Sequence, residues 1–125
     1  MNLAEIIERH PADDTALISR GRSTTYGELR RQVASLRGVL AEHHVERGDR
    51  VAILCGNSRY FVIAYLATLG VGGVAVPLNI ISPASEIQRE LDEVQPRIVF
   101  VEPAAMTAWN TCLLYTSPSP RDVEE

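Results

Sequence analysis

The sequence contains no lysine, so its 12 Lys-or-Arg positions are all arginines. Without a side-chain ammonium, the chain cannot form a Schiff base with a carbonyl substrate and has no phosphate-loop lysine. Cysteine is nearly as scarce, and Cys55 and Cys112 each stand alone. The two cysteines therefore indicate neither a disulfide framework nor a cysteine-cluster metal site.

Positive charge and targeting signals are also scarce. The 12 arginines face 16 acidic residues, and this net charge of −4 argues against a nucleic-acid partner, which usually meets a basic face. Residues 1–9 are acidic and amphipathic and lack the basic start and apolar core of a secretory signal. We therefore expect a cytoplasmic location. The remaining composition, 46% hydrophobic and 22% charged, is typical of a globular domain.

One uncharged run, Tyr60–Ile81, is long enough to span a membrane. Its centre holds Gly70, Gly72 and Gly73, and Pro77 follows. Although glycine and proline are tolerated in spanning helices, this cluster favours a buried helix, a glycine turn and a buried strand. We therefore expect no transmembrane segment.

Hydrophobic periodicity predicts helices and strands in alternation. The expected elements are a short helix (3–9) with Leu3, Ile6 and Ile7 on one face, a hairpin (16–19 and 23–25), a helix from Thr25 with a stripe at Leu29, Val33, Leu36 and Leu40, a strand (51–55), a helix (59–69), a strand (74–76), a helix with a stripe at Ile87, Leu91 and Val94, and a strand (98–101). This order predicts an α/β fold in which helices cover a mostly parallel sheet and a short hairpin precedes it.

The expected helix ends have recognisable signals. Thr25 and Glu28 have the spacing of a capping box. Either Asn57 or Ser58 is expected to cap the helix over 59–69, which is apolar nearly all round and should be deeply buried. Ser82-Pro83 predicts an N-cap followed by proline at the first helical position.

The pattern fails near the end of the chain. Residues 112–122 (CLLYTSPSPRD) have two prolines in three residues and no periodicity. They resemble the translated read-through of a common transposon-based sequencing adaptor. We therefore expect residues 112–125 to be a non-native tail; the alternative is a natural Ser/Pro-rich terminus.

Two glycine-containing turns invite a functional interpretation. A phosphate-binding loop follows a strand and opens a helix, whereas Gly70–Gly73 follows a helix and precedes a strand, so a helix end and a tight crossover are expected. Gly56–Tyr60 is similar to a nucleophile elbow around Ser58, but Tyr60 replaces its second glycine and no histidine follows. We expect Ser58 to cap a helix.

Other polar residues give no site either. His43 and His44 are adjacent on a helix and point about 100° apart, so they are expected to mark a helix end rather than bind one metal ion. Solvated surface charge is expected for two carboxylate pairs, Glu5 with Glu8 and Glu90 with Glu93. Cys55 is expected to be a small core residue.

Four short motifs follow one another within residues 15–101. They are Thr24–Leu29 (TTYGEL), Val45–Leu54 (VERGDRVAIL), Asn57–Leu66 (NSRYFVIAYL) and Leu69–Asn79 (LGVGGVAVPLN). Together they resemble the N-terminal part of acyl-CoA synthetases and related AMP-binding, adenylate-forming ligases, although Val71 replaces a usual alanine. Residues 1–111 are therefore expected to be the truncated N-terminal part of an AMP-binding domain, a partial N-terminal subdomain.

The resemblance implies an ATP-dependent ligation of CoA to a small-molecule carboxylic acid, fatty or aryl, through an acyl-adenylate. It implies ATP, Mg²⁺ and CoA for the full-length family, whose glycine-rich phosphate loop and C-terminal lysine are missing from this chain. Tyr115–Ser117 resembles the start of that loop, but its glycines are absent and Pro118 has no N–H for a phosphate.

No catalytic, cofactor-binding or metal-binding residue is therefore assigned to this chain. We expect a catalytically incomplete fragment of such a ligase that binds none of these cofactors. The alternative is a small stand-alone α/β domain that binds or interacts without catalysis.

Overall fold

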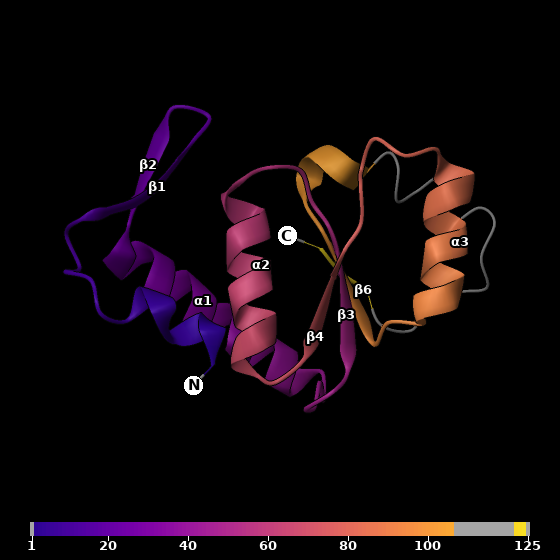
Figure 1. The fold of residues 1–125 in the computed structure, drawn as a ribbon, viewed down its shortest axis with the longest axis horizontal. Helices are drawn as coiled ribbons and strands as arrows, with labels where there is room; N and C mark the ends of the chain where they lie inside the picture. The colour runs from indigo at the N-terminus through magenta and orange to yellow at the C-terminus, as the bar shows by residue number, and fades with distance from the viewer. Residues whose placement is uncertain (1, 107–121, 125) are drawn as a thin grey trace.

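The computed structural model describes residues 2–106 and 122–124 and confirms the α/β architecture (Figure 1). The elements, in chain order, are η1 (Leu3–Ile7), β1 (Thr15–Ser19), β2 (Arg22–Thr25), α1 (Tyr26–Glu42), β3 (Arg50–Leu54), α2 (Arg59–Gly70), β4 (Val74–Pro77), α3 (Ala84–Val94), β5 (Ile98–Val101), η2 (Pro103–Ala105) and β6 (Asp122–Glu124). No helix within residues 2–106 is both long and apolar enough to cross a membrane.

A parallel sheet forms the centre of the molecule. Its strand order is β4-β3-β5-β6, and each neighbouring pair is parallel. The two inner strands, β3 and β5, are buried from Val51 to Leu54 and from Ile98 to Val101. Burial on both faces explains why their sequences are continuous apolar runs rather than alternating ones.

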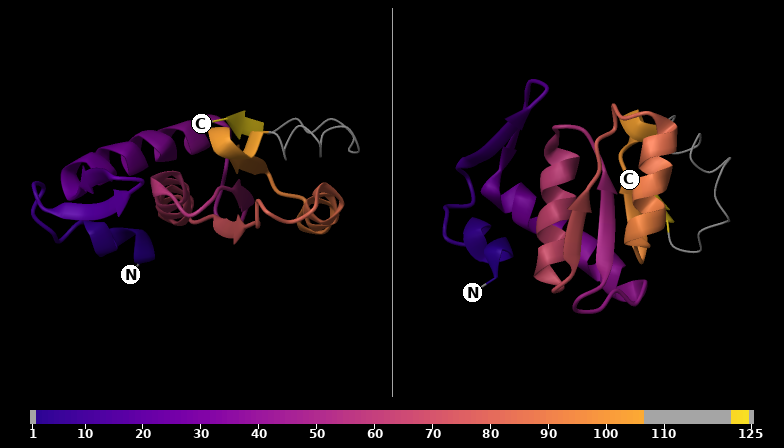
Figure 2. Two further views of the ribbon diagram at one scale, coloured as in Figure 1. Left: turned by 90° about the horizontal axis from the view of Figure 1, so that it is seen from above. Right: turned by 45° about the vertical axis from the view of Figure 1, so that its right-hand side comes forward.

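Helices cover both faces of this sheet, as Figures 1 and 2 show. Alternate residues of a strand point to opposite faces. Val51, Ile53 and Phe100 pack with α1 and α2, whereas Leu54 and Val99 pack with α3. The sheet therefore separates two hydrophobic clusters, and the predicted covering of the sheet by helices is confirmed.

Strand β6 lies in the segment expected to be a non-native tail. Asp122–Glu124 pair with Val99–Val101 of β5, although no strand was expected there. Backbone groups make such a pair, so a segment of any origin can add to an open strand edge. The assignment of residues 112–125 as non-native remains a prediction, and residues 107–121 lie outside the described residues.

The edge strand β4 carries the other open side of the sheet. Val74 and Leu78 donate backbone N–H groups to Asp49 O and Ile53 O, at 2.8 and 2.9 Å. These bonds align β4 with β3, and Pro77 ends the strand as expected. Val74 is exposed on this edge.

The hairpin and the start of α1 follow the sequence signals. Strands β1 and β2 are antiparallel, and the turn residues Arg20 and Gly21 both have positive φ, 53° and 78°. Such a two-residue turn matches the twist of a hairpin. Thr25 Oγ1 accepts from Glu28 N–H at 3.1 Å, and Glu28 Oε1 accepts from Thr25 N–H at 3.0 Å, so the capping box is confirmed.

The capping box makes stability pH-dependent. The hydrogen bond from the Thr25 N–H, followed by that from its hydroxyl, lowers the pKa of Glu28 below its ordinary value of 4.5. A lowered folded-state pKa stabilises the fold above the unfolded-state pKa, and this contribution disappears as pH falls through the folded-state pKa. We expect Glu28→Gln to be less stable than wild type at pH 7, with a smaller difference near pH 3. Urea titrations at both pH values check this; a difference that does not shrink contradicts it.

Three local expectations need correction. The first element is a 3₁₀-helix with only Ala4 and Ile7 buried, because Leu3 and Ile6 face solvent. Helix α2 is less buried than its composition suggests, since several of its apolar residues are only half-buried. The third correction concerns α3, which starts one residue late, with Pro83 in the N-cap position instead of Ser82.

The glycine crossover after α2 is confirmed as a helix end followed by a strand. Gly72 has φ +82°, and a Cβ there would lie 3.2 Å from Arg47 Cγ. Gly73 N–H donates to Thr68 O at 2.9 Å, which closes the turn before β4. Only glycine adopts the left-handed conformation of Gly72 without strain.

Two glycine-to-alanine substitutions should therefore have opposite signs. Gly72→Ala is expected to destabilise the chain by about 1–2 kcal/mol, because it places a Cβ in left-handed backbone. Gly38→Ala is the matched control: Gly38 is inside α1 with open space around its Cα, so alanine should stabilise by up to about 1 kcal/mol. Thermal unfolding of both variants checks whether the midpoint falls for Gly72→Ala and rises for Gly38→Ala. Equal shifts of the two midpoints would contradict the left-handed conformation assigned to Gly72.

Candidate functional site

The carboxyl edge of the parallel sheet is the natural place to look for a site. Ligands of open α/β sheets bind outside the carboxyl ends of the strands, where the strand order reverses. The turn Gly56–Ser58 follows β3 and leads into α2, and Glu102 follows β5. Because β3 and β5 are parallel neighbours, these two segments meet at one edge.

Glu102 occupies this meeting point. It is 1% exposed, and its Oε1 accepts the Gly56 N–H, while its Oε2 accepts the Ser58 hydroxyl at 3.1 Å. Its own N–H donates to Leu54 O at 3.3 Å. The carboxylate therefore ties the end of β5 to the end of β3 and to the start of α2.

An open groove, here called the edge groove, runs beside this point. It is lined by Arg20, Cys55, Gly56, Asn57, Phe61, Asn79, Ile80 and Ile81. The lining combines one guanidinium and two amides with large apolar side chains. These groups can bind and orient a ligand, but they contain no histidine or carboxylate to act as a general base.

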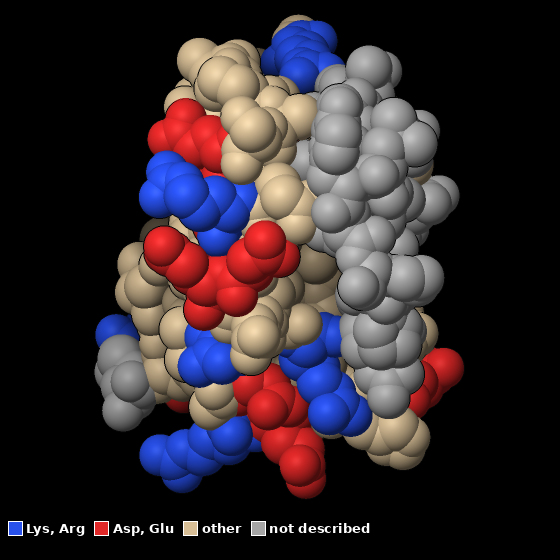
Figure 3. Space-filling view, turned by 90° about the vertical axis from the view of Figure 1, so that its right-hand side faces the viewer, with Lys and Arg blue, Asp and Glu red and all other residues tan. Residues whose placement is uncertain are grey.

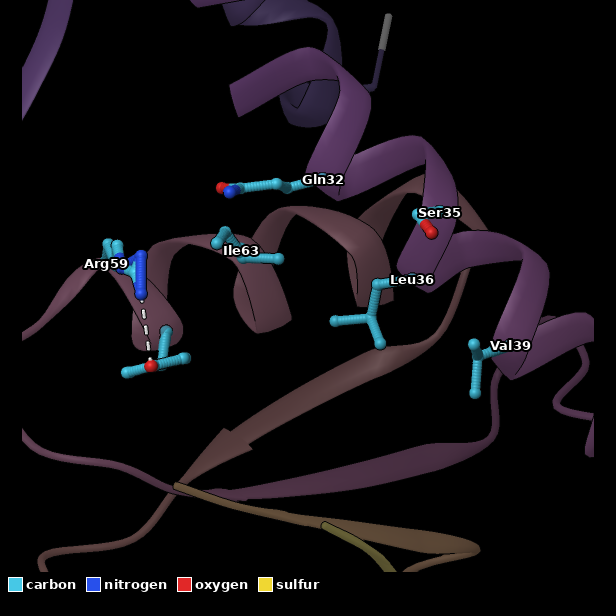
Figure 4. Close-up of a pocket in the computed structure, with 7 residues that line it drawn as sticks. Gln32, Ser35, Leu36, Val39, Arg59 and Ile63 are labelled. Carbon is cyan, nitrogen blue, oxygen red and sulfur yellow. Dashed lines mark hydrogen bonds between the residues drawn. The ribbon is translucent and has the colours of Figure 1, made fainter. Parts of the chain in front are cut away.

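A second groove, the helix groove, lies between α1 and α2 (Figure 4). It is lined by Gln32, Ser35, Leu36, Val39, Arg59, Tyr60 and Ile63. Arg59 donates to the Tyr60 hydroxyl at 3.1 Å, and its guanidinium carbon lies 4.7 Å from the Tyr60 ring centroid. This contact engages the Arg59 guanidinium, and the seven described lining residues include no carboxylate, imidazole or thiolate that could bind a metal ion.

Ser58 is in the N-cap position of α2, as expected, but its side chain makes no cap hydrogen bond. Its hydroxyl donates to Glu102 instead. Two of the three histidines that precede it are engaged elsewhere: His10 stacks on Tyr26 with centroids 4.3 Å apart, and His43 Nδ1 lies 2.9 Å from Val39 O. The described residues therefore do not form a serine–histidine pair at Ser58.

The other polar candidates also have structural positions. His43 ends α1, and His44 follows it with φ 61°, as expected of a helix end. Within residues 2–106 and 122–124, no three potential metal ligands gather. Cys55 is buried in the core cluster that contains Val51 and Ile53. Tyr115–Ser117 and Cys112 lie outside the described residues.

The expectation that the two carboxylate pairs are solvated surface charge holds for only some of their residues. On α3, Arg89 lies among acidic residues, 3.7 Å from Glu86 and 4.0 Å from Glu93. Figure 3 shows acidic and basic groups side by side on this face of the molecule. Glu90 differs from this expectation, because its Oε1 is buried. Glu5 also has a structural role, since its carboxylate accepts the Asn2 N–H at 3.2 Å in a capping box of η1.

Glu102 is the residue that the sequence interpretation missed. The signal was present, because an acidic residue directly after a buried apolar run is costly unless it is hydrogen-bonded. The partners could not be inferred, since Ser58 is 44 positions away in the chain. Only the pairing of β3 with β5 brings them together.

Neither of the two glycine-containing turns fits a nucleotide phosphate. A phosphate needs N–H donors or cations around it. The Gly56 N–H and the Ser58 hydroxyl already donate to the Glu102 carboxylate, which would repel another anion at this turn. Gly70–Gly73 ends a helix and does not open one.

Comparison with known proteins identifies the family. A family profile described as AMP-binding enzyme matches residues 3–123. The 3-hydroxybenzoate–CoA ligase of Aromatoleum sp. (strain CIB) is 34% identical over 107 residues, which cover 82% of this chain and 20% of that protein. Tyrocidine synthase 1 of Brevibacillus parabrevis is 34% identical over 90 residues, covering 72% of this chain and 8% of that protein. The chain spans about a fifth or less of these curated relatives.

Solved structures show the same fold. A benzoate CoA ligase from Burkholderia xenovorans superposes with a TM-score of 0.88 at 22% identity, over all of this chain and 26% of that one. An anthranilate CoA ligase in complex with anthranoyl-AMP gives a TM-score of 0.89 at 20% identity, over 25% of its chain. With the profile match across residues 3–123, the chain belongs to the family of AMP-binding enzymes.

Proposed function

We propose that this chain is the N-terminal part of an ATP-dependent carboxylic-acid–CoA ligase that acts through an acyl-adenylate. The observation that carries the proposal is the family match over residues 3–123, together with 34% identity to a 3-hydroxybenzoate–CoA ligase. In this proposal residues 1–111 belong to the AMP-binding domain, and residues 112–125 are non-native. A cytoplasmic location accompanies it, because ATP and CoA are the cosubstrates.

An aryl acid is the favoured substrate class over a fatty acid. Two relatives are named as hydroxybenzoate–CoA ligases, 34% and 33% identical to this chain. ATP, Mg²⁺ and CoA would supply the adenylate, the charge neutralisation and the thiol. The residues of this chain would supply the scaffold: the parallel sheet, its covering helices and the Glu102 link between β3 and β5.

An amino-acid-activating domain is the second candidate. Tyrocidine synthase 1 is 34% identical over 90 residues, as similar as the aryl ligase over a shorter stretch. Both candidates would activate a carboxylate as its adenylate. The first would then transfer the acyl group to CoA, whereas the second would activate an amino acid without transferring it to CoA.

The test requires the coding sequence beyond residue 111 in the source genome. The extended protein is expected to contain a glycine-rich phosphate loop and to form CoA thioesters from benzoate or hydroxybenzoates. Thioester detected only with fatty acids would overturn the aryl assignment. Adenylation of amino acids without CoA transfer would favour the second candidate. An extended frame without a phosphate loop would overturn both and favour a stand-alone binding domain.

A further inference from the structure

Beside Glu102, the chain changes the side of β3 on which it adds the next strand, although all the strands stay parallel. From β3 the chain passes through α2 to β4 on one side, then through α3 to β5 on the other side of β3. Such a reversal opens a crevice outside the carboxyl ends of the two inner strands, where ligands of α/β sheets bind. In this chain the Glu102 side chain lies in that crevice. Figure 1 shows that η2, which directly follows Glu102, is at the same edge of the sheet as the start of α2.

We propose that Glu102 is a built-in anion at the turn that leads into α2, where it positions the turn and occupies the place that an anionic ligand would take beside the Gly56 N–H and the Ser58 hydroxyl. A helix N-terminus presents unpaired N–H groups and a partial positive charge, which favour an anion. Phosphate or carboxylate groups of ligands meet this need in many nucleotide-binding folds. Here the chain supplies the anion itself.

The hydrogen bonds around Glu102 suit a carboxylate. Each oxygen accepts from a donor, Oε1 from the Gly56 N–H and Oε2 from the Ser58 hydroxyl. Both ion pairs found in the described part of the chain involve Arg89 on α3, so no arginine there neutralises Glu102. A buried carboxylate without a cation depends on such donors and on the helix N-terminus.

The shape of the turn points to the same role. Gly56 has no side chain, and a Cβ built on it would lie 2.9 Å from Glu102 Oε1, so that the carboxylate would have to shift. The same Cβ would lie 3.3 Å from Ile80 Cδ1. Glycine at this position therefore admits the carboxylate to the backbone N–H that it accepts.

This role has a consequence for the edge groove. Gly56 and Asn57 line that groove, and Glu102 binds the turn that carries them. Its carboxylate therefore acts as a positioning group for the groove wall. The inference goes beyond the proposed function and does not depend on it, because it concerns the folded chain alone.

The experiment compares the 125-residue chain with Glu102→Gln and Glu102→Ala in thermal unfolding, with sodium formate or sodium chloride at equal ionic strength. Glu102→Gln keeps the shape but turns an amide NH₂ toward one of two donors, so its midpoint should fall below wild type. In Glu102→Ala, formate should enter the vacated space and raise the midpoint in a saturable manner, whereas chloride should not. Formate should leave wild type and Glu102→Gln unchanged, because their crevice is filled. Glu42→Gln, an exposed carboxylate at the end of α1, is the control and should match wild type.

Several results would overturn the proposal. The first is an unfolding midpoint of Glu102→Gln equal to that of wild type. This result would contradict the proposed role of Glu102 even if Glu102→Ala fails to fold. The second is formate stabilising every variant equally, or a folded Glu102→Ala that formate does not stabilise. Gly56→Ala gives an independent check: it should lower the midpoint and speed amide exchange at residues 56–58, and wild-type exchange there would count against the proposal.

Discussion

Replacing Ile53 with alanine is expected to lower the free energy of unfolding by about 2–5 kcal/mol. Ile53 is in the inner strand β3, is 0% exposed, and packs in the cluster that β3 and β5 share with α1 and α2. The substitution removes buried methyl and methylene groups and leaves a cavity that the surrounding strands cannot fill. Since domains are stable by only about 5–15 kcal/mol, a large share of the total is lost. Urea unfolding followed by circular dichroism measures the change.

Ile81→Ala is the matched control, because the same residue type is 84% exposed there. Its effect should stay within about 0.5 kcal/mol, as for most surface substitutions. Ile53→Val should lie between the two, at about 0.5–1.5 kcal/mol. Equal losses for Ile53→Ala and Ile81→Ala would show that the sheet does not hold the core described above.

The second large effect concerns catalysis. The 125-residue chain is expected to show no carboxylate-dependent exchange of pyrophosphate into ATP. Transfer to the α-phosphate requires cations and N–H donors preorganised around the developing charge. The chain has no lysine, and the Gly56 N–H and the Ser58 hydroxyl before α2 already donate to Glu102. Enzymes in general accelerate reactions at least about a millionfold, so without these groups only the background rate should remain.

Exchange of labelled pyrophosphate with benzoate, 3-hydroxybenzoate and a fatty acid measures this directly. The 3-hydroxybenzoate–CoA ligase of Aromatoleum sp. serves as the positive control in the same buffer. Exchange that rises in proportion to the concentration of the purified chain would contradict the prediction. It would also mean that residues of this chain hold a nucleotide, against the arrangement around Glu102.

The elements that the sequence predicted well are those whose signals are local. The capping box at Thr25 and Glu28 spans three positions, and the stripe Leu29–Leu40 repeats with the period of one helix. The apolar runs of β3 and β5 also identify themselves as buried strands, because both faces of each are covered. Local geometry decides such features, so local patterns suffice.

The features that the sequence did not predict depend on contacts between distant segments. Ser58 has the right position for an N-cap, yet its hydroxyl turns to Glu102, a partner that only the pairing of β3 with β5 provides. Helix α2 is apolar nearly all round, so its composition could not indicate which side packs on the sheet and which lines the helix groove. One local feature was also missed: Asn2 and Glu5, three positions apart, form a capping box at the start of η1.

The edge strand β4 has a consequence for self-association. Val74 and Leu78 direct their N–H groups to β3, so the backbone positions that could donate at the open edge of β4 are those of Ala75 and Pro77. Pro77 has no N–H, which removes one of the donors that an incoming strand would need. Pairing of two copies of this chain edge to edge through β4 is therefore expected to be weaker than pairing through an edge with every donor present.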